Sequence, residues 1–180
     1  MSQNTRAVTI GSLVVSDQPD DVLVAYGLGS CIALCLYDPV KHVGGMLHAL
    51  LPNVPNGRHP ENVAKFVDLG TEELVRVLAN RGSPLHRLVI HLCGGAKMLI
   101  IPGDEGLPIG ARNTQVAEAT LAALGLKIHG RATGGDKGRT VRLYITTGLV
   151  TVSSLGSAEQ AVGAKTPAHE TGHSKEVWDE

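Results

Sequence analysis

The sequence is organised around one stretch, GLGSCIALCLYDP, at residues 27–39. Residues 31–37 of this stretch are apolar throughout and end at an Asp-Pro pair, a pattern typical of a strand that is buried on both faces. The two glycines and Ser30 before them favour a tight turn, because glycine adopts backbone conformations that other residues avoid. The stretch therefore predicts a central buried strand that begins at Cys31, directly after a turn.

Apolar and amphipathic segments on both sides of this strand predict the remaining elements. Further strands are expected at residues 8–15, 22–26, 43–50, 85–93, 128–132 and 141–152, the last split into a hairpin at Thr147-Gly148. Helices are expected at residues 61–81, ended by Gly82, and from a cap at Asn113 to Gly125, with Val116, Thr120, Ala123 and Leu124 facing inward. The fold class is therefore α/β, a mixed α+β sandwich with a β-rich N-terminal half and two main helices covering a mixed sheet.

Length and composition favour a single domain followed by a tail. The chain has 180 residues, and 43% of them are hydrophobic, which is enough for a core. The last part is polar and small, so we expect one domain at residues 1–156 and a flexible tail at 157–180. His169 and His173 in this tail have the spacing of a zinc-protease motif, but Gly172 disfavours the rigid helix that such a motif requires. No metal site is expected there.

The charge balance removes the usual electrostatic argument for a nucleic-acid or anionic-membrane partner. Sixteen Lys and Arg residues against 17 Asp and Glu give a formal net charge of −1, and one Phe, one Trp and three Tyr residues leave few rings for stacking on bases. The longest uncharged stretch, residues 22–37, contains glycines and is too short to span a bilayer comfortably. Residues 1–6 carry no apolar run of a secretory signal, so we expect a soluble, cytoplasmic protein with reduced thiols.

Cys31 and His48 are the candidate catalytic residues. If residues 31–37 and 42–50 form a hairpin with a four-residue loop, Cys31 lies directly opposite His48 on one face, with Cβ atoms about 4.5–5.5 Å apart. A one-residue slip would place them on opposite faces. An imidazolium beside a thiol lowers the thiol pKa and yields the thiolate that attacks carbonyl groups, and donors from the glycine turn can form an oxyanion hole. The pair therefore predicts nucleophilic thiol chemistry.

Each of these residues also has a simpler interpretation. Taken alone, Cys31 is a small buried hydrophobic residue, and His48 is a structural or surface histidine. Cys35 lies four residues along the same strand, on the same face but deeper, and we interpret both Cys35 and Cys93 as core residues.

Glycine-rich and polar blocks follow one another in a fixed order along the chain. They are GLGSC (27–31), YDP (37–39), GGMLHALLP (44–52), CGGAKM (93–98), IGARN (109–113) and TGG (133–135). Together they resemble the CheD family of chemoreceptor glutamine deamidases, and the resemblance spans about residues 8–152. GLGSC alone would be a weak signal, but these ordered blocks are highly specific.

The resemblance implies an enzyme that hydrolyses selected glutamine side chains of methyl-accepting chemotaxis receptors to glutamate, with release of ammonia. Cys31 would attack the carboxamide carbon. His48 would take the thiol proton, protonate the leaving ammonia and then activate water on the thioester. The resemblance also implies an α/β sandwich, no metal or organic cofactor, and a CheC-type phosphatase as a partner besides the chemoreceptors.

One position departs from the family's pattern, because Ala25 stands where the family usually has a threonine that counts as the third active-site member. A backbone carbonyl near Val24 or Ala25, or the side chain of Ser30, could instead orient His48. Gly29 belongs to the turn that could supply oxyanion donors. Two alternatives stay open: a CheD-like adaptor that binds receptors or a CheC-type phosphatase with little or no catalysis, and a different cysteine-dependent amidase or esterase. Retention of both candidate catalytic residues favours the deamidase.

Overall fold

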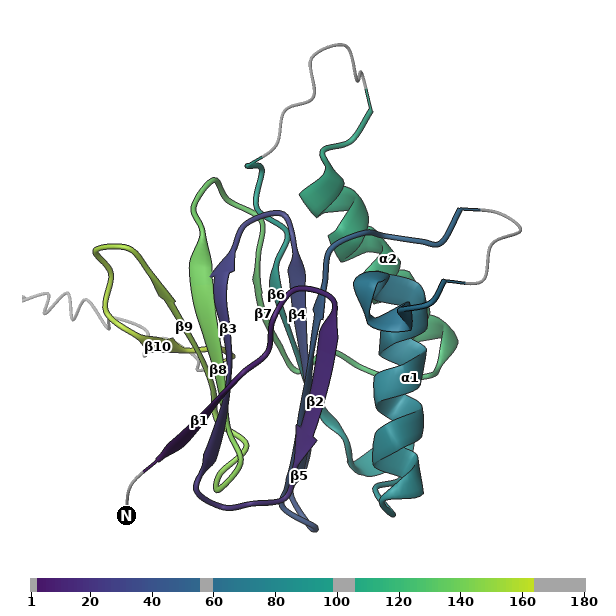
Figure 1. Cartoon of the computed structure of the whole chain (residues 1–180), viewed down its shortest axis with the longest axis vertical. Helices are drawn as coiled ribbons and strands as arrows, with labels where there is room; N and C mark the ends of the chain where they lie inside the picture. The colour runs from purple at the N-terminus through teal and green to yellow at the C-terminus, as the bar shows by residue number, and fades with distance from the viewer. Residues whose placement is uncertain (1–2, 56–59, 99–105, 164–180) are drawn as a thin grey trace, which may run out of the picture.

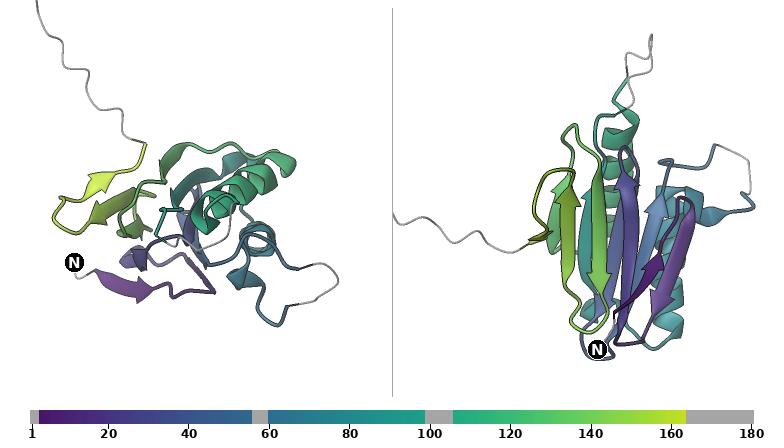
Figure 2. Two further views of the ribbon diagram at one scale, coloured as in Figure 1. Left: turned by 90° about the horizontal axis from the view of Figure 1, so that it is seen from above. Right: turned by 60° about the vertical axis from the view of Figure 1, so that its left-hand side comes forward.

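The computed structural model describes residues 3–55, 60–98 and 106–163, which form three layers (Figure 1). Two five-stranded sheets pack face to face, and two helices cover the outer face of the second sheet (Figures 1 and 2). This arrangement confirms the expected sandwich of mixed sheets covered by two helices. Within the described ranges, no helix is long and apolar enough to cross a membrane.

Each sheet combines parallel and antiparallel pairs. The first sheet has, in spatial order, β1 (Asn4–Ala7), β3 (Asp21–Leu28), β8 (Arg139–Tyr144), β9 (Val150–Ser154) and β10 (Gln160–Ala161). The second has β2 (Ser12–Ser16), β5 (Val43–Ala49), β4 (Ile32–Asp38), β6 (Val89–Gly94) and β7 (Gly130–Thr133). The helices are α1 (Val67–Asn80) and α2 (Ile109–Ala123), and two short 3-10 turns are η1 (Val63–Lys65) and η2 (Leu85–Arg87). The pairs β1–β3 and β6–β7 are parallel.

Strand β4 is central in the second sheet and is buried along its whole length. Its side chains alternate between two cores: Ile32, Leu34 and Leu36 pack with the helices, and Ala33, Cys35 and Tyr37 pack with the first sheet. The alternation follows from the two-residue period of a strand, and both sides are apolar because both are covered. The expected central strand is confirmed, and Cys31 lies just before its first residue.

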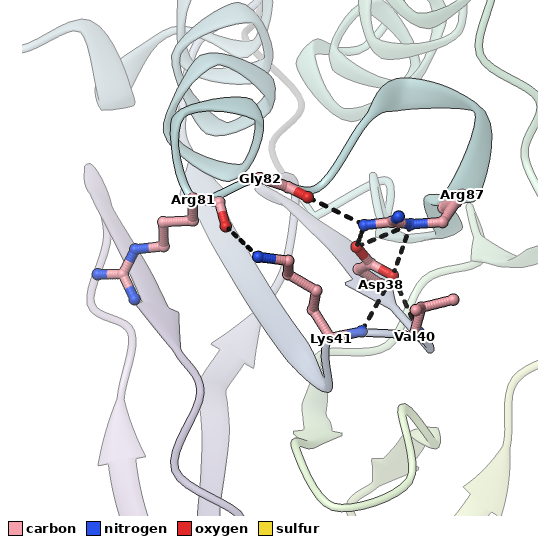
Figure 3. Close-up of polar contacts among 6 residues, drawn as sticks. All are labelled: Asp38, Val40, Lys41, Arg81, Gly82 and Arg87. Carbon is pink, nitrogen blue, oxygen red and sulfur yellow. Dashed lines mark hydrogen bonds and ion pairs between the residues drawn. The ribbon is translucent and has the colours of Figure 1, made fainter.

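The closed end of the β4–β5 hairpin is held by the fully buried carboxylate of Asp38 (Figure 3). Asp38 accepts hydrogen bonds from Nε and Nη2 of Arg87, the latter at 2.6 Å. The backbone N–H groups of Val40 and Lys41 donate to the same carboxylate. The Arg87 guanidinium and the Lys41 ammonium also donate to carbonyl groups at the end of α1. The hairpin loop is thereby tied to α1, at the opposite end of β4 from Cys31.

The strand expected at residues 8–15 begins only at Ser12, because residues 8–11 connect β1 of the first sheet to β2 of the second. The chain leaves β1 in the first sheet, turns at Gly11 with a φ of 73°, and enters β2 in the second. Glycine adopts this left-handed backbone at little cost, whereas most other residues avoid it. The hairpin expected at Thr147-Gly148 is confirmed between β8 and β9.

The helix expected at residues 61–81 begins later, at Val67. Phe66 interrupts it, because its backbone is extended and forms a parallel bridge with Leu51. The expected end at Gly82 is confirmed by its φ of 81°. The strand expected at residues 85–93 likewise begins only after η2, at Val89.

Helix α2 begins at Ile109, and Pro108 rather than Asn113 occupies its N-cap position. The buried side of α2 also differs from the expected one and consists of Gly110, Asn113, Ala117 and Leu121. A capping asparagine uses its side-chain oxygen as an acceptor at the helix end. Here the Asn113 amide acts as a donor to two buried carbonyl groups, which draws this residue into the interior.

The first sheet continues past residue 156. Strand β10 pairs with β9, and Val162 is buried in the core between the sheets. Residues 164–180, with His169 and His173, lie outside the described residues, so a flexible tail stays a prediction.

Candidate active site

The loop between β3 and β4 is fixed at each of its three residues. Each of its carbonyl groups accepts one hydrogen bond of 2.8–2.9 Å. The donors are the N–H of Ala96 to Gly29, the side-chain Nδ2 of Asn113 to Ser30, and the N–H of Gly95 to Cys31. The backbone that carries the candidate nucleophile is therefore held by the turn after β6 and by α2.

The turn after β6 can approach this loop because it contains two glycines. Gly94 and Gly95 have φ values of 108° and 65°, which residues with side chains avoid. A Cβ atom at Gly94 would overlap the carbonyl of Cys31, and one at Gly95 would overlap Thr114 Oγ1 and the backbone of Gly110. The block CGGAKM thus holds the loop that precedes β4.

Cys31 is nearly buried, with 6% of its surface exposed, between the two sheets. Burial disfavours the thiolate and raises the pKa of Cys31, while a hydrogen bond from its own backbone N–H opposes the rise. The side chain is therefore a thiol at neutral pH in the free protein. The same N–H group lies beside the reacting sulfur, where an oxyanion would develop after attack on a carbonyl.

The β4–β5 ladder ends at Ile32, so Cys31 lies one residue outside it and does not stand opposite His48. The partner of His48 is Ala33. The expected register is wrong by two residues, because the hairpin loop begins one residue later than expected. An even shift preserves the face. Cys31, two residues before Ala33, belongs with Ala33 to the core between the sheets, so it lies on the side of the second sheet that His48 shares with Ala33 and not in direct opposition to His48.

The ring of His48 is 2% exposed and is held by the main chain. Its Nδ1 lies 2.9 Å from the carbonyl oxygen of Val8. A carbonyl oxygen can only accept, so Nδ1 carries the hydrogen and Nε2 keeps a lone pair. Nε2 is buried and has no hydrogen-bond partner among the described residues. Burial lowers the pKa of His48, although the bond to Val8 opposes this, so the imidazole is neutral at neutral pH.

The orienting group is Val8, which the sequence analysis did not identify. Its own N–H donates to the carbonyl of Val24 at 2.8 Å. The carbonyl of Val24 therefore holds Val8, instead of contacting the His48 ring directly as expected. Ala25 is fully buried in the core between the sheets. The Ser30 hydroxyl does not hydrogen-bond the ring, because Nδ1 is bound to Val8 and Nε2 has no partner among the described residues. Val8 precedes His48 by 40 positions, and only the parallel β1–β3 pairing could have located it.

The free site holds a thiol and a neutral imidazole, whereas the sequence predicts a thiolate lowered in pKa by an imidazolium. The two pKa shifts have one cause, because burial disfavours the charged form of each group. The lone pair on Nε2 is nevertheless the acceptor that general-base removal of the thiol proton requires. The two groups become an ion pair only when that proton moves.

A pocket of about 410 Å³ opens beside His48. Its lining is uncharged and consists of Ala7, Val8, Thr9, Ile10, Tyr26 and His48. Ile10 and Tyr26 expose 57% and 55% of their surface. Each of these exposed side chains lies at an irregularity of the backbone. Ile10 precedes the left-handed turn at Gly11, and Tyr26 lies where the register of β3 shifts. The pocket can receive an uncharged segment of a polypeptide next to the imidazole.

The other two cysteines lie in the core, as expected. Cys35 and Cys93 are 1% and 0% exposed. Burial raises the pKa of Cys93 to about 12 and that of Cys35 well above its usual value. Neither thiol has the access or the charge of a nucleophile. In the part of the chain that the structure describes, no group of three or more His, Cys, Asp or Glu residues could hold a metal ion.

Comparison with known proteins gives one consistent family. Residues 50–154 match the family described as "CheD chemotactic sensory transduction". A probable chemoreceptor glutamine deamidase CheD of Symbiobacterium thermophilum is 45% identical over 86% of this chain and 94% of its own length. A probable chemoreceptor glutamine deamidase CheD of Pyrococcus horikoshii is 42% identical over 79% and 88%. The chemoreceptor glutamine deamidase CheD of Thermotoga maritima is 36% identical over 86% and 95%.

Proposed function

This chain belongs to the CheD family, and from that membership we propose that it is a chemoreceptor glutamine deamidase acting through Cys31 and His48. One observation carries the proposal. The hydrogen bond to the Val8 carbonyl fixes the tautomer of His48, and within the described part of the chain Nε2 keeps an unpaired lone pair on the face that Cys31 shares. The names of the relatives supply the substrate class, glutamine side chains of chemoreceptors.

In the first half of the reaction, Cys31 becomes acylated by the substrate. Nε2 of His48 takes the thiol proton, and the sulfur attacks the carboxamide carbon of the glutamine. The negative charge that develops on the amide oxygen is stabilised by the backbone N–H of Cys31, which already lies at the sulfur. The C–N bond then breaks, and the nitrogen leaves as ammonia with the proton from Nε2.

In the second half, water hydrolyses the thioester. Nε2 is again neutral and removes a proton from water as the oxygen attacks the carbonyl carbon. The C–S bond breaks, the sulfur regains the proton, and the substrate side chain leaves as glutamate. The Val8 carbonyl stabilises the imidazolium in both halves, because its oxygen faces the Nδ1–H.

The pocket beside His48 supports a polypeptide substrate. Its uncharged walls, with the exposed Tyr26 and Ile10, can contact residues that flank the target glutamine. A buried pair of neutral groups also suits an uncharged amide better than a charged substrate, because entry of the amide costs less desolvation.

The proposal extends to the setting of the enzyme. A CheC-type phosphatase is proposed as a second partner and the cytoplasm as the location. The resemblance of the sequence blocks supports both, whereas the names of the relatives mention only chemoreceptors.

The test is incubation of the full chain with the cytoplasmic region of a chemoreceptor. Peptide mass spectrometry detects the conversion of glutamine to glutamate, and a coupled assay measures the ammonia released. We expect conversion by the unaltered protein and by Cys35→Ala, but none by Cys31→Ala or His48→Ala. Conversion that survives Cys31→Ala would overturn the assignment of the nucleophile. Receptor binding without any conversion would instead support the adaptor alternative.

A further inference from the structure

We propose that Asn113 is a positioning residue for the Cys31–His48 pair. Its effect on catalysis rests on the proposed function, whereas its effect on the position of Cys31 does not. Asn113 is fully buried in the second turn of α2. Its side-chain Nδ2 donates to the carbonyl of Ser30 at 2.9 Å and to the carbonyl of Leu50 at 3.0 Å. These two acceptors flank the two candidate catalytic residues.

The amide joins two strands at the point where their own ladder ends. In the β4–β5 hairpin, the last paired residues at the site end are Ile32 and Ala49. Ser30 and Leu50 lie beyond that pair, so no β-ladder bond holds them together. The two hydrogens of one Nδ2 group span the gap, and Asn113 takes the place of a further rung of the ladder.

The two ends of the hairpin are thus closed by different devices. At the far end, the loop and the Asp38–Arg87 ion pair close it (Figure 3). At the site end, Leu50 turns away toward η1, where its N–H donates to the carbonyl of Lys65. Without the Asn113 amide, the backbone before Cys31 and the backbone after His48 would diverge in separate directions.

The orientation of the amide is determined by its acceptors. Both neighbours are carbonyl oxygens, so a flipped amide would place Oδ1 against them. Among the described residues, Oδ1 is buried without a partner, and a buried acceptor that lacks a hydrogen bond destabilises the folded state. An apolar side chain at this position would avoid the unpaired Oδ1, but it would also lose the two hydrogen bonds that Nδ2 donates.

Helix α2 gives Asn113 a rigid base. Gly110 packs so closely on the turn after β6 that a Cβ atom there would lie 2.7 Å from the carbonyl carbon of Gly95. Gly95 in turn donates to the carbonyl of Cys31. The position of the cysteine loop relative to β5 is therefore set from α2, on the far side of the second sheet from the catalytic face.

The experiment compares Asn113→Ala with Leu121→Ala, both made in the full chain. Leu121 is fully buried two turns further along α2 and belongs to the core between the helices and the second sheet, so its truncation weakens the packing of α2 without removing either hydrogen bond. The primary measurement is the pH profile of Cys31 alkylation by iodoacetamide, which needs no receptor. We expect Asn113→Ala to expose Cys31, which speeds alkylation and lowers its apparent pKa toward the ordinary value, and Leu121→Ala to leave the profile unchanged.

The second measurement is receptor deamidation by the same variants. We expect kcat to fall of the order of tenfold to a hundredfold in Asn113→Ala with little change in KM, because misplacement of reacting groups costs rate rather than binding. If Asn113→Ala does not fold, Asn113→Ser, which keeps one donor, is compared with Leu121→Ala in both measurements instead. Equal alkylation profiles and equal kcat in the Asn113 and Leu121 variants would overturn the proposal. Absence of deamidation in the unaltered protein would contradict the proposed function, while the alkylation profile still decides the role of Asn113.

Discussion

The imidazole of His48 is oriented by the main chain of Val8, 40 positions earlier, through a hydrogen bond of 2.9 Å. A backbone acceptor needs no particular side chain at position 25, so Ala25 does not leave the ring without a partner. The bond also determines which nitrogen can act as the base, because it commits Nδ1 to the role of donor.

Selective alkylation should identify the reactive thiol. Iodoacetamide should modify Cys31 before Cys35 and Cys93, because only Cys31 lies at a strand end beside a buried base, whereas the other two are core residues. Burial raises the pKa of Cys31 above that of an ordinary thiol, so its labelling rate should keep increasing with pH beyond the range in which an exposed thiol is already ionised. Peptide mass spectrometry measures the extent of labelling at each of the three cysteines. Equal labelling of all three cysteines in the folded protein would argue against Cys31.

Ala25→Thr should not raise activity. The resemblance to the family would imply a gain, because the family's threonine counts as an active-site member, but the Val8 carbonyl already orients His48. Ala25 is fully buried between the sheets, so the added atoms should overpack the core and lower the free energy of unfolding by about 1–3 kcal/mol. Urea unfolding and deamidation kinetics measure the two effects. A gain in kcat at unchanged stability would show that the Val8 carbonyl is an insufficient acceptor.

Asp38 should make folding stability depend on acid pH. Burial alone would raise its pKa, but hydrogen bonds from Arg87 and other donors outweigh burial and lower it from 3.8 to about 2. A lowered native pKa stabilises the fold above the unfolded pKa, and this contribution is lost as the pH falls from about 4 through about 2. It amounts to about 2 kcal/mol at neutral pH.

The measurement is urea unfolding between pH 5 and about 2 for the unaltered protein and Asp38→Asn, since their difference cancels the other carboxylates. We expect the unaltered protein to lose its advantage across that window. A difference that does not change with pH would mean that the Asp38 charge contributes nothing beyond its shape.

The exposed walls of the pocket should affect substrate binding more than chemistry. Tyr26→Ala and Ile10→Ala should each raise KM for a receptor several-fold, up to about tenfold, with kcat nearly unchanged, because they remove apolar contact without touching the reacting groups. Val40→Ala is the control, since Val40 is 66% exposed at the far end of the hairpin. A fall in kcat alone, or an equal effect of Val40→Ala, would contradict this use of the pocket.

Strand β4, which follows Cys31, was predictable because it is buried on both faces and its sequence is an unbroken apolar run. The face shared by Cys31 and His48 was also correct, since a register error of two residues preserves the alternation. The register itself depends on where the loop begins, and that is fixed by the Asp38–Arg87 contact, which joins residues 49 positions apart.

The parts that could not be predicted depend on contacts between distant segments. Asn113 resembles a helix cap in the sequence, and only the carbonyls of Ser30 and Leu50 explain its place inside α2. Residues 8–15 have the alternation of one strand, but residues 8–11 instead carry the chain from the first sheet to the second through the turn at Gly11. Val8 acts through its backbone, which no pattern of side chains records.

Val8 also joins the two sheets, since its N–H binds the first through Val24 and its carbonyl binds the second through His48. A chain in which only one sheet has formed carries the cysteine but has no aligned base. On the proposed mechanism, we therefore expect nascent or partly unfolded copies to be inert toward the glutamines of other proteins, since His48 is aligned only once the two sheets have packed together. The proposed activity would thereby be confined to the fully folded molecule.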